Sequence, residues 1–342
     1  MSAAFILGMS ILFVSGLSNG SFAWPMKYAR RWQWENIWLF FTFMALLVMP
    51  LLLTGTLVPH LRELYASAPW RELLPALIFG FLWGIAQATF GIGIAAVGMA
   101  LAIAVVVGIT GFLGSLIPML VLHPEELFRP KGIALMISLP ILILALALYG
   151  MAGRRREKEQ ESQNGRPVEH KMSFAAGLGI CIFTGVFGAL LNFGFAFSGP
   201  LQARSVRLGA NPASSALAIW MPVLLAGFIP NLLYCSYLLF RNRTWSLYAC
   251  KGWPKEAAMG AAMAVLWLGG VEGYGKGTTY FKGSGTSFGF AFLIASTVLA
   301  SNLLGLFSGE WDGTSTRTRR LLNGAVATVL SAMVILGVGG ML

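Results

Sequence analysis

The sequence has few charged residues. Asp, Glu, Lys and Arg make up 11% of its 342 residues, whereas about a quarter of the residues in a typical soluble domain are charged. Hydrophobic residues make up 57%, and the mean hydropathy is +0.73. This composition excludes an ordinary soluble domain. It predicts an all-α polytopic membrane protein whose main partner is the lipid bilayer.

Residues suited to catalysis or metal binding are also scarce. Histidine, cysteine and aspartate together occur at His60, His123, His170, Cys181, Cys235, Cys250 and Asp312. None of the histidines has the i, i+4 spacing of a zinc-binding helix, and the cysteines lack the spacing of metal ligands. No phosphate-binding G-x-x-x-x-G-K-[ST] sequence occurs, and the glycines lie in apolar runs where small residues let helices approach closely. We therefore expect no enzyme activity, no cofactor and no metal.

Basic residues are absent from the first 26 positions and are unevenly placed after them. A secretory signal carries positive charge before its apolar core, whereas the first basic residue here is Lys27. The N-terminal apolar run is therefore predicted to be a retained membrane helix. The net charge of +11 comes from short loops between apolar runs, which indicates membrane orientation rather than nucleic-acid binding.

One long polar segment divides the chain nearly in half. Residues 153–171 hold ten of the 37 charged residues, so this segment cannot lie at membrane depth. It predicts a cytoplasmic hinge loop between a first unit, residues 1–152, and a second unit, residues 172–342.

The apolar runs predict ten transmembrane helices. Residues 73–122 contain no charge, and one helix of that length would exceed twice the hydrocarbon thickness, so two spans with a turn near Gly98 are expected. Pro222 and Pro230 are expected to interrupt the seventh span. The predicted spans are 4–24, 37–58, 74–97, 99–122, 132–151, 172–203, 208–240, 257–280, 283–309 and 321–342.

The two halves contain similar local patterns. Trp83 is followed by Phe90-Gly91, and Trp267 is followed at the same spacing by Tyr274-Gly275. A weaker echo joins Phe5, Gly8 and Gly16 to Phe174, Gly177 and Gly185. Chance matching of common residues is the competing explanation. If the halves are repeats, five spans in each make the second copy inverted in the membrane.

The loops predict the orientation. Loops after odd-numbered spans hold 16 Lys and Arg residues, and loops after even-numbered spans hold 8. Because basic loops remain on the cytoplasmic side, the hinge is predicted to be cytoplasmic and both termini to lie outside.

A sparse set of polar and aromatic side chains is predicted at membrane depth. Amides both donate and accept hydrogen bonds, and aromatic rings pack on the C–H faces of sugars, so such groups suit a small polar solute in a cavity between repeats. For each residue, an interhelical hydrogen bond or packing is the alternative role. The candidates are Asn19, Trp83, Gln87, Asn192, Trp220, Asn231, Tyr274 and Asn302.

Glu272 is the only acidic residue well inside an apolar run. A carboxylate in hydrocarbon is costly, so it is expected to face the bundle interior or a cavity and to be a candidate proton-coupling group. Lys276, at i+4 on the same face, provides the alternative of a structural ion pair. Direct substrate contact is a third possibility.

Six stretches carry a family resemblance. They are FAWPMKYARRWQWENIW (22–38), FGFLWGIAQATFGIGIAAVGMALA (79–102), GSLIPMLVLHPEEL (114–127), LLNFGFAFSGP (190–200), FIPNLLYCSYLL (228–239) and SNLLGLFSGEWDG (301–313). The chain resembles the L-rhamnose/proton symporter family of the drug/metabolite transporter superfamily. The resemblance implies ten helices in two inverted five-helix repeats, a central substrate path and proton-driven transport. At Glu272 the chain departs from the family pattern, which has an uncharged residue there.

Together these observations predict a secondary active transporter in the inner membrane, with proton-coupled uptake of a small sugar or related polar metabolite. The alternative within transport is an exporter of amino acids or other small metabolites, because one fold serves many substrates. An enzyme would require a cluster of His, Asp or Glu near one interface, and a channel would require a repeated pore-lining motif. The sequence contains neither pattern.

Overall fold

The computed structural model describes residues 3–164, 173–281 and 283–342, and the regular structure in these ranges is entirely helical. The elements are α1 (Ala3–Ser21), η1 (Trp24–Tyr28), α2 (Trp34–Thr42), η2 (Phe43–Val48), α3 (Met49–Leu57), α4 (Leu61–Ser67), α5 (Trp70–Val97), α6 (Met99–Leu122), η3 (Pro124–Glu126), α7 (Pro130–Asn164), α8 (Phe174–Gly188), α9 (Leu190–Phe197), α10 (Gly199–Arg207), α11 (Leu217–Asn242), η4 (Trp245–Ala249), α12 (Trp253–Thr278), α13 (Gly285–Phe307) and α14 (Thr316–Met341).

Nine helical segments of the described chain are long and apolar enough to cross a membrane. They correspond to nine of the ten predicted spans, which confirms a multi-pass membrane protein. The remaining predicted span corresponds to α12. Polar residues including Glu272 and Lys276, together with several glycines, lower its hydropathy. Even so, α12 packs against α1, α2, α11 and α13 within the bundle.

The predicted turn at Gly98 is present. Gly98 separates α5 from α6 with φ of +88°, a left-handed backbone that favours glycine. The break also falls where Glu157 of α7 approaches, since Glu157 accepts a hydrogen bond from the backbone N–H of Ala100 at 3.2 Å.

The polar segment 153–171 differs from the predicted loop. Its first part is helical, because α7 continues to Asn164, while residues 165–171 lie outside the described residues. Arg, Lys, Glu and Gln are strong helix formers, so a polar run of this composition can extend a helix beyond the membrane. Tertiary contacts support the extension: Glu159 accepts hydrogen bonds from Ser315 and Thr318 at the start of α14.

The sixth and seventh predicted spans also differ from expectation. The seventh span is not interrupted, since α11 continues through Pro222 and Pro230. Proline removes one helical hydrogen bond, but neighbouring helices can stabilise such a site in a membrane bundle. Tyr65 of α4 does so at Pro222, because its hydroxyl donates at 2.9 Å to the carbonyl of Ala218, four residues before that proline. By contrast, the sixth predicted span divides into α8, α9 and α10.

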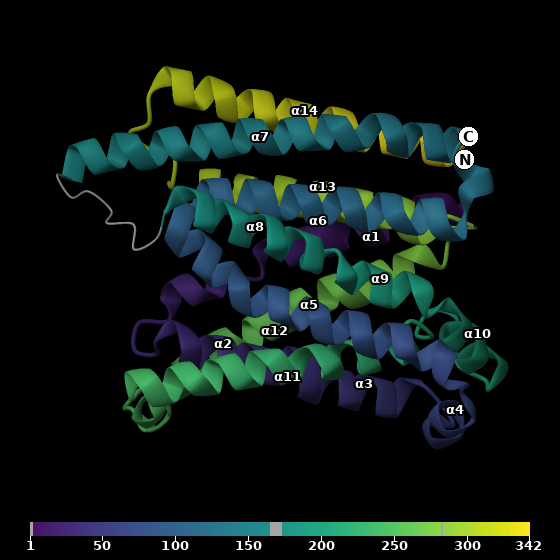
Figure 1. Ribbon diagram of the computed structural model, residues 1–342. Coiled ribbons are helices and arrows are strands. Elements are labelled where there is room, and N and C mark those ends of the chain that lie inside the picture. The colour runs from purple at the N-terminus through teal and green to yellow at the C-terminus, as the bar shows by residue number, and fades with distance from the viewer. Residues whose placement is uncertain (1–2, 165–172, 282) are drawn as a thin grey trace.

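The first helix of each half packs on helices of the other half. Helix α1 lies against α12 and α13, whereas α8 lies against α5 and α6. Glycines allow both approaches: a Cβ on Gly16 would lie 2.2 Å from Ser296 of α13, and one on Gly185 would lie 2.7 Å from Ile109 of α6. Helices α7 and α14, the last of each half, run side by side along one edge of the bundle (Figure 1).

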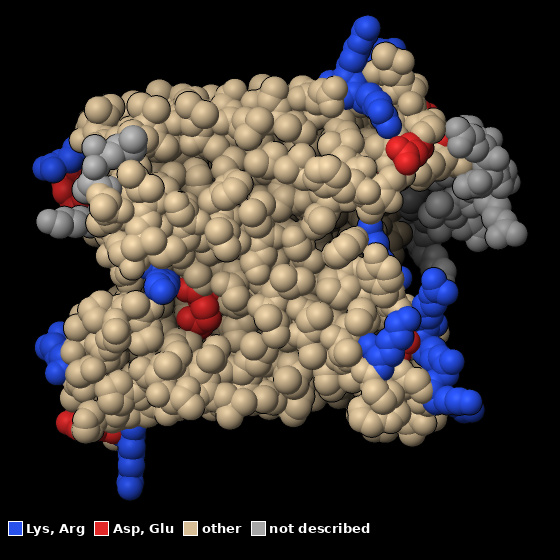
Figure 2. Space-filling view, turned by 180° about the vertical axis from the view of Figure 1, so that it is seen from behind, with Lys and Arg blue, Asp and Glu red and all other residues tan. Residues whose placement is uncertain are grey.

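Charged side chains gather mainly at the two ends of the bundle and leave a broad apolar belt between them (Figure 2). The termini lie at one end, and the C-terminus of α7 lies at the other (Figure 1). At the α7 end, Glu310 pairs with Lys27 and with Arg156, the latter at 3.2 Å. At the terminal end, Glu72 pairs with Arg204 through two contacts of 3.0 Å. Ion pairs therefore join segments of the two halves at both ends of the bundle.

Candidate functional site

An amide and a phenol form the centre of the polar interior. The hydroxyl of Tyr274 on α12 donates a hydrogen bond of 2.5 Å to Oδ1 of Asn192 on α9. Asn192 Nδ2 donates to the carbonyl of Gly114 on α6 at 2.7 Å. Both side chains are buried. Two of the predicted site residues thus meet and link α6, α9 and α12.

An aromatic platform adjoins this pair. The ring of Trp220 on α11 stacks on Phe195 of α9, with centroids 4.5 Å apart and an interplanar angle of 12°. The Tyr274 ring lies 5.4 Å from Phe195 and 6.2 Å from Trp220. The buried indole N–H of Trp220 has no hydrogen-bond partner within the described part of the chain. The indole N–H of Trp220 and its stacked ring therefore adjoin the Asn192–Tyr274 pair.

A second cluster lies two helical turns along α12. Trp267 stacks on Trp83 of α5, with centroids 5.7 Å apart and an interplanar angle of 17°. Phe41 of α2 packs edge-on to Trp267, and Trp38 packs edge-on to Phe41. Because Trp267 and Tyr274 are seven residues apart, they lie on one face of α12. That face therefore contributes to both clusters.

Asn231 belongs to the second cluster. Its Oδ1 accepts a hydrogen bond of 3.1 Å from the indole N–H of Trp38, and its Nδ2 donates to backbone carbonyls of α5 and α11. The residue is fully buried. Asn231 therefore links α2, α5 and α11 through its amide oxygen and its amide nitrogen.

The other amide candidates lie elsewhere. Gln87 is half-buried on α5, one turn after Trp83. Asn19 on α1 packs beside Gly270 of α12. Asn302 donates a hydrogen bond to the carbonyl of Val298 within its own helix, at 2.8 Å. The structure therefore joins Asn192, Tyr274 and Trp220 in one cluster and Trp83 and Asn231 in another.

Glu272 lies at the margin of the contact between α1 and α12. Its neighbours Gly269 and Gly273 approach Ser18 and Ser15 of α1. Val265, Gly269 and Lys276, which share its helical face, are exposed, while Glu272 is half-buried. Glu272 therefore lies at the edge of the α1 contact with its Oε1 buried, and its expected placement toward the bundle interior or a cavity stays a prediction.

The carboxyl of Glu272 is not engaged by Lys276. Its Oε1 is buried and has no hydrogen-bond partner among the described residues. The ion pairs of the described residues do not include one between Glu272 and Lys276. In this conformation the carboxyl has no counter-charge from Lys276.

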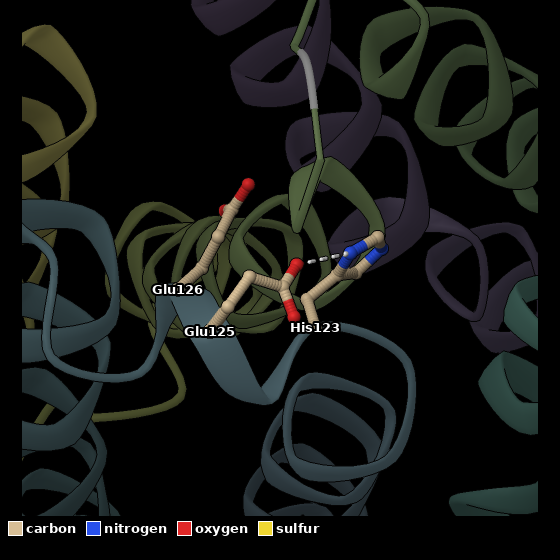
Figure 3. Close-up of side chains that lie close together, drawn as sticks. All are labelled: His123, Glu125 and Glu126. Atoms are coloured by element: carbon tan, nitrogen blue, oxygen red, sulfur yellow. Dashed lines mark ion pairs between the residues drawn. The ribbon is translucent and has the colours of Figure 1, made fainter.

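His123, Glu125 and Glu126 lie near one another in the loop between α6 and α7 (Figure 3). His123 Nδ1 lies 3.5 Å from Glu125 Oε1. Glu126 turns away and accepts hydrogen bonds from the N–H and hydroxyl of Ser284. Burial alone would raise the pKa of Glu126, but the Ser284 hydrogen bonds and nearby positive charge lower it overall. Glu126 thus connects two loops, one from each half.

Comparison with known proteins identifies the family. The family model of the L-rhamnose-proton symport protein matches residues 1–341. The chain belongs to the L-rhamnose-proton symport protein family. It is 26% identical to the L-rhamnose-proton symporter of Pectobacterium atrosepticum, with 98% of each chain covered. It is 27% identical to that of Mannheimia succiniciproducens with 98% of each covered, and 23% identical to that of Shigella sonnei with 99% of each covered.

The structure of this L-rhamnose-proton symport family member also assembles residues absent from the predicted site. Phe195, Trp267 and Trp38 each pack directly on a candidate side chain. Trp267 had a sequence signal, because its spacing to Tyr274 repeats that of Trp83 to Phe90. Phe195 and Trp38 lack an equivalent signal, since one aromatic residue in an apolar run resembles any other.

Proposed function

We propose that this chain is a proton-coupled symporter for a small sugar of the L-rhamnose type. Family membership along the whole chain and the names of its relatives support this assignment. The observation that carries it in the structure is the Asn192–Tyr274 pair beside the stacked rings of Trp220 and Phe195. Hydrogen-bonding groups next to flat aromatic surfaces match the alternating hydroxyl and C–H surfaces of a sugar.

The indole N–H of Trp220 has no partner among the described residues and can donate a hydrogen bond to a substrate hydroxyl. Leaving a buried donor unsatisfied costs about 1–3 kcal/mol, so a substrate hydroxyl that accepts from it would remove this cost. Asn192 and Tyr274 already satisfy each other, and they would exchange that bond for bonds to substrate when the helices separate. Substrate binding would then compete with the contact between α9 and α12.

The proposed architecture is ten membrane helices in two inverted five-helix repeats, with α12 as the eighth span. The reciprocal packing of α1 and α8 on the other half supports it. The stacked pair Trp83 and Trp267 supports it as well, because these residues have the same local spacing in the two halves. The same arrangement is consistent with membership of the drug/metabolite transporter superfamily.

Within this architecture, we assign the coupling proton to Glu272. A carboxyl in a membrane helix is costly as an isolated charge, and one without an ion-pair partner is suited to take up and release a proton. Its position beside α1 would let movement between α1 and α12 alter its surroundings. The loop charges favour a cytoplasmic hinge, external termini and an inner-membrane location for this transporter.

Uptake by proteoliposomes containing the purified full chain tests the function. Labelled L-rhamnose should accumulate when the lumen is made alkaline relative to the outside, and a protonophore should abolish the accumulation. A panel of labelled hexoses and amino acids provides the comparison. Accumulation of an amino acid without accumulation of any sugar would reject the proposed substrate class.

A further inference from the structure

A groove of about 580 Å³ lies between α6 and α7, away from the two aromatic clusters. Val105, Ile109 and Phe112 contribute from α6, and Ile143 and Ala147 contribute from α7. Apart from Arg154, all the residues that line it are apolar. Its volume is within the range of pockets that hold a small ligand.

Small residues create the depth of this groove. The two helices meet closely where a Cβ on Gly153 would lie 2.4 Å from the Cβ of Ala100. Farther along, Gly108 leaves space, since a Cβ there would have only Leu146 at 3.6 Å. The outer side chains Ile143 and Ala147 are exposed. In a bilayer these exposed apolar positions face acyl chains, so a hydrocarbon chain fits the groove.

Arg154 gives one end of the groove a positive charge. It is exposed, and its guanidinium lies 5.6 Å from the ring centroid of Phe174. The described part of the chain provides no ion-pair partner for it. Nearby carboxylates have other contacts, since Glu157 accepts from Ala100 and Glu159 from Ser315. A guanidinium in this position can bind a phosphate oxygen with paired hydrogen bonds.

We propose that the α6–α7 groove binds an anionic phospholipid. One acyl chain lies along Val105, Ile109 and Ala147, and the headgroup phosphate binds Arg154. Basic sites beside membrane helices recognise anionic headgroups in this way. The lipid would contact α6, the helix whose Gly114 carbonyl holds Asn192, and would support that helix from the membrane side.

Native mass spectrometry of the full chain can test this site by titration with phosphatidylglycerol and with phosphatidylcholine of the same acyl chains. Arg154→Gln should weaken phosphatidylglycerol binding by about tenfold and change phosphatidylcholine binding little, because one charge-assisted contact is lost. Gly108→Leu should weaken both lipids by filling the groove. Ala147→Leu, at an exposed position, should do the same and covers the case in which Gly108→Leu does not fold.

Two control variants test whether the loss of lipid binding is specific to the groove or follows from any lost charge or any added side chain. Arg317→Gln removes an exposed cation at the start of α14, and Gly179→Leu adds a side chain at an exposed position with open space. Both should bind lipid like the parent protein. Unchanged phosphatidylglycerol binding in Arg154→Gln and Ala147→Leu would overturn the proposal. So would a groove variant that converts a dimer to a monomer with lipid binding unchanged, because the occupant would then be a second copy.

Discussion

The hydroxyl of Tyr274 on α12 lies 2.5 Å from Oδ1 of Asn192 on α9 and donates a hydrogen bond to it. The two residues are 82 positions apart in the chain, and the same amide also holds the carbonyl of Gly114 on α6. A buried amide that joins three helices is suited to change partners when the helices move. Substitution of these side chains, followed by uptake measurements, can therefore test their roles in transport.

Removal of the predicted amides should weaken substrate binding. Asn192→Ala and Gln87→Ala should each raise the apparent Km for sugar uptake by about three- to tenfold, the effect of losing one hydrogen bond to a neutral partner. Initial uptake rates in proteoliposomes measure this change. Asn323→Ala, which removes an exposed amide on α14, is the matched control. Unchanged kinetics in both site variants would assign these amides to packing.

Glu272→Gln should abolish pH-driven accumulation while sugar exchange across the membrane continues. The substitution keeps the shape and polarity of the side chain but removes the group that binds the proton. Counterflow and gradient-driven uptake, measured on the same preparation, separate the two activities. Normal gradient-driven uptake by a folded Glu272→Gln protein would reject the coupling role.

Lys276→Met distinguishes coupling from a structural ion pair. If Glu272 couples protons without Lys276, this variant should keep gradient-driven uptake and the parent melting temperature. A structural pair would instead make Glu272→Gln unstable, and Lys276→Met would partly restore stability in the double variant. Thermal unfolding of the two single variants and the double variant in detergent provides the measurement.

Cysteine labelling tests the orientation. In a Cys250→Ser background, Ser162→Cys should resist an impermeant thiol reagent in intact cells, whereas Glu125→Cys at the opposite end should react. The expected pattern follows from the excess of basic residues in loops after odd-numbered spans. Ready labelling at position 162, with protection at position 125, would reverse the assignment.

The loop contact of Glu126 should make stability depend on pH. Because the folded-state pKa of Glu126 is lowered, its contribution is present above the ordinary glutamate value of about 4.3 and is lost as pH falls through the lowered folded value. Melting temperatures measured across this acidic range should fall less steeply in Ser284→Ala, which lacks the hydroxyl donor. If the melting temperature falls equally steeply with pH in the parent and in Ser284→Ala, the Glu126–Ser284 contact does not cause the pH dependence.

The crossing of α5 and α11 should not tolerate an added methyl group. A Cβ at Gly84 would lie 2.4 Å from the carbonyl oxygen of Gly227, a backbone atom. Gly84→Ala should therefore reduce the free energy of unfolding by about 1–3 kcal/mol through overpacking. Gly55→Ala in α3 meets open space and is the control. Equal melting temperatures for the two variants would show that this crossing adjusts freely.

Local properties of the chain determined most of the membrane spans. Hydropathy and length are summed over neighbouring residues, so nine predicted spans have counterparts among the nine candidate membrane helices. The turn at Gly98 was also predictable, because the uncharged run of residues 73–122 is too long to be a single membrane span. The repeated Trp spacing singles out Trp83 and Trp267, and the rings of these two residues stack on each other.

Tertiary structure decided what the local pattern could not. Residues 153–164 remain helical beyond the apolar run, where Glu157 contacts the start of α6 and Glu159 contacts the start of α14. The rotation of α12 sets Tyr274 against Asn192 and leaves Glu272 on a different face beside α1. A sequence gives the spacing of side chains along one helix, but the partner of each side chain depends on how that helix crosses its neighbours.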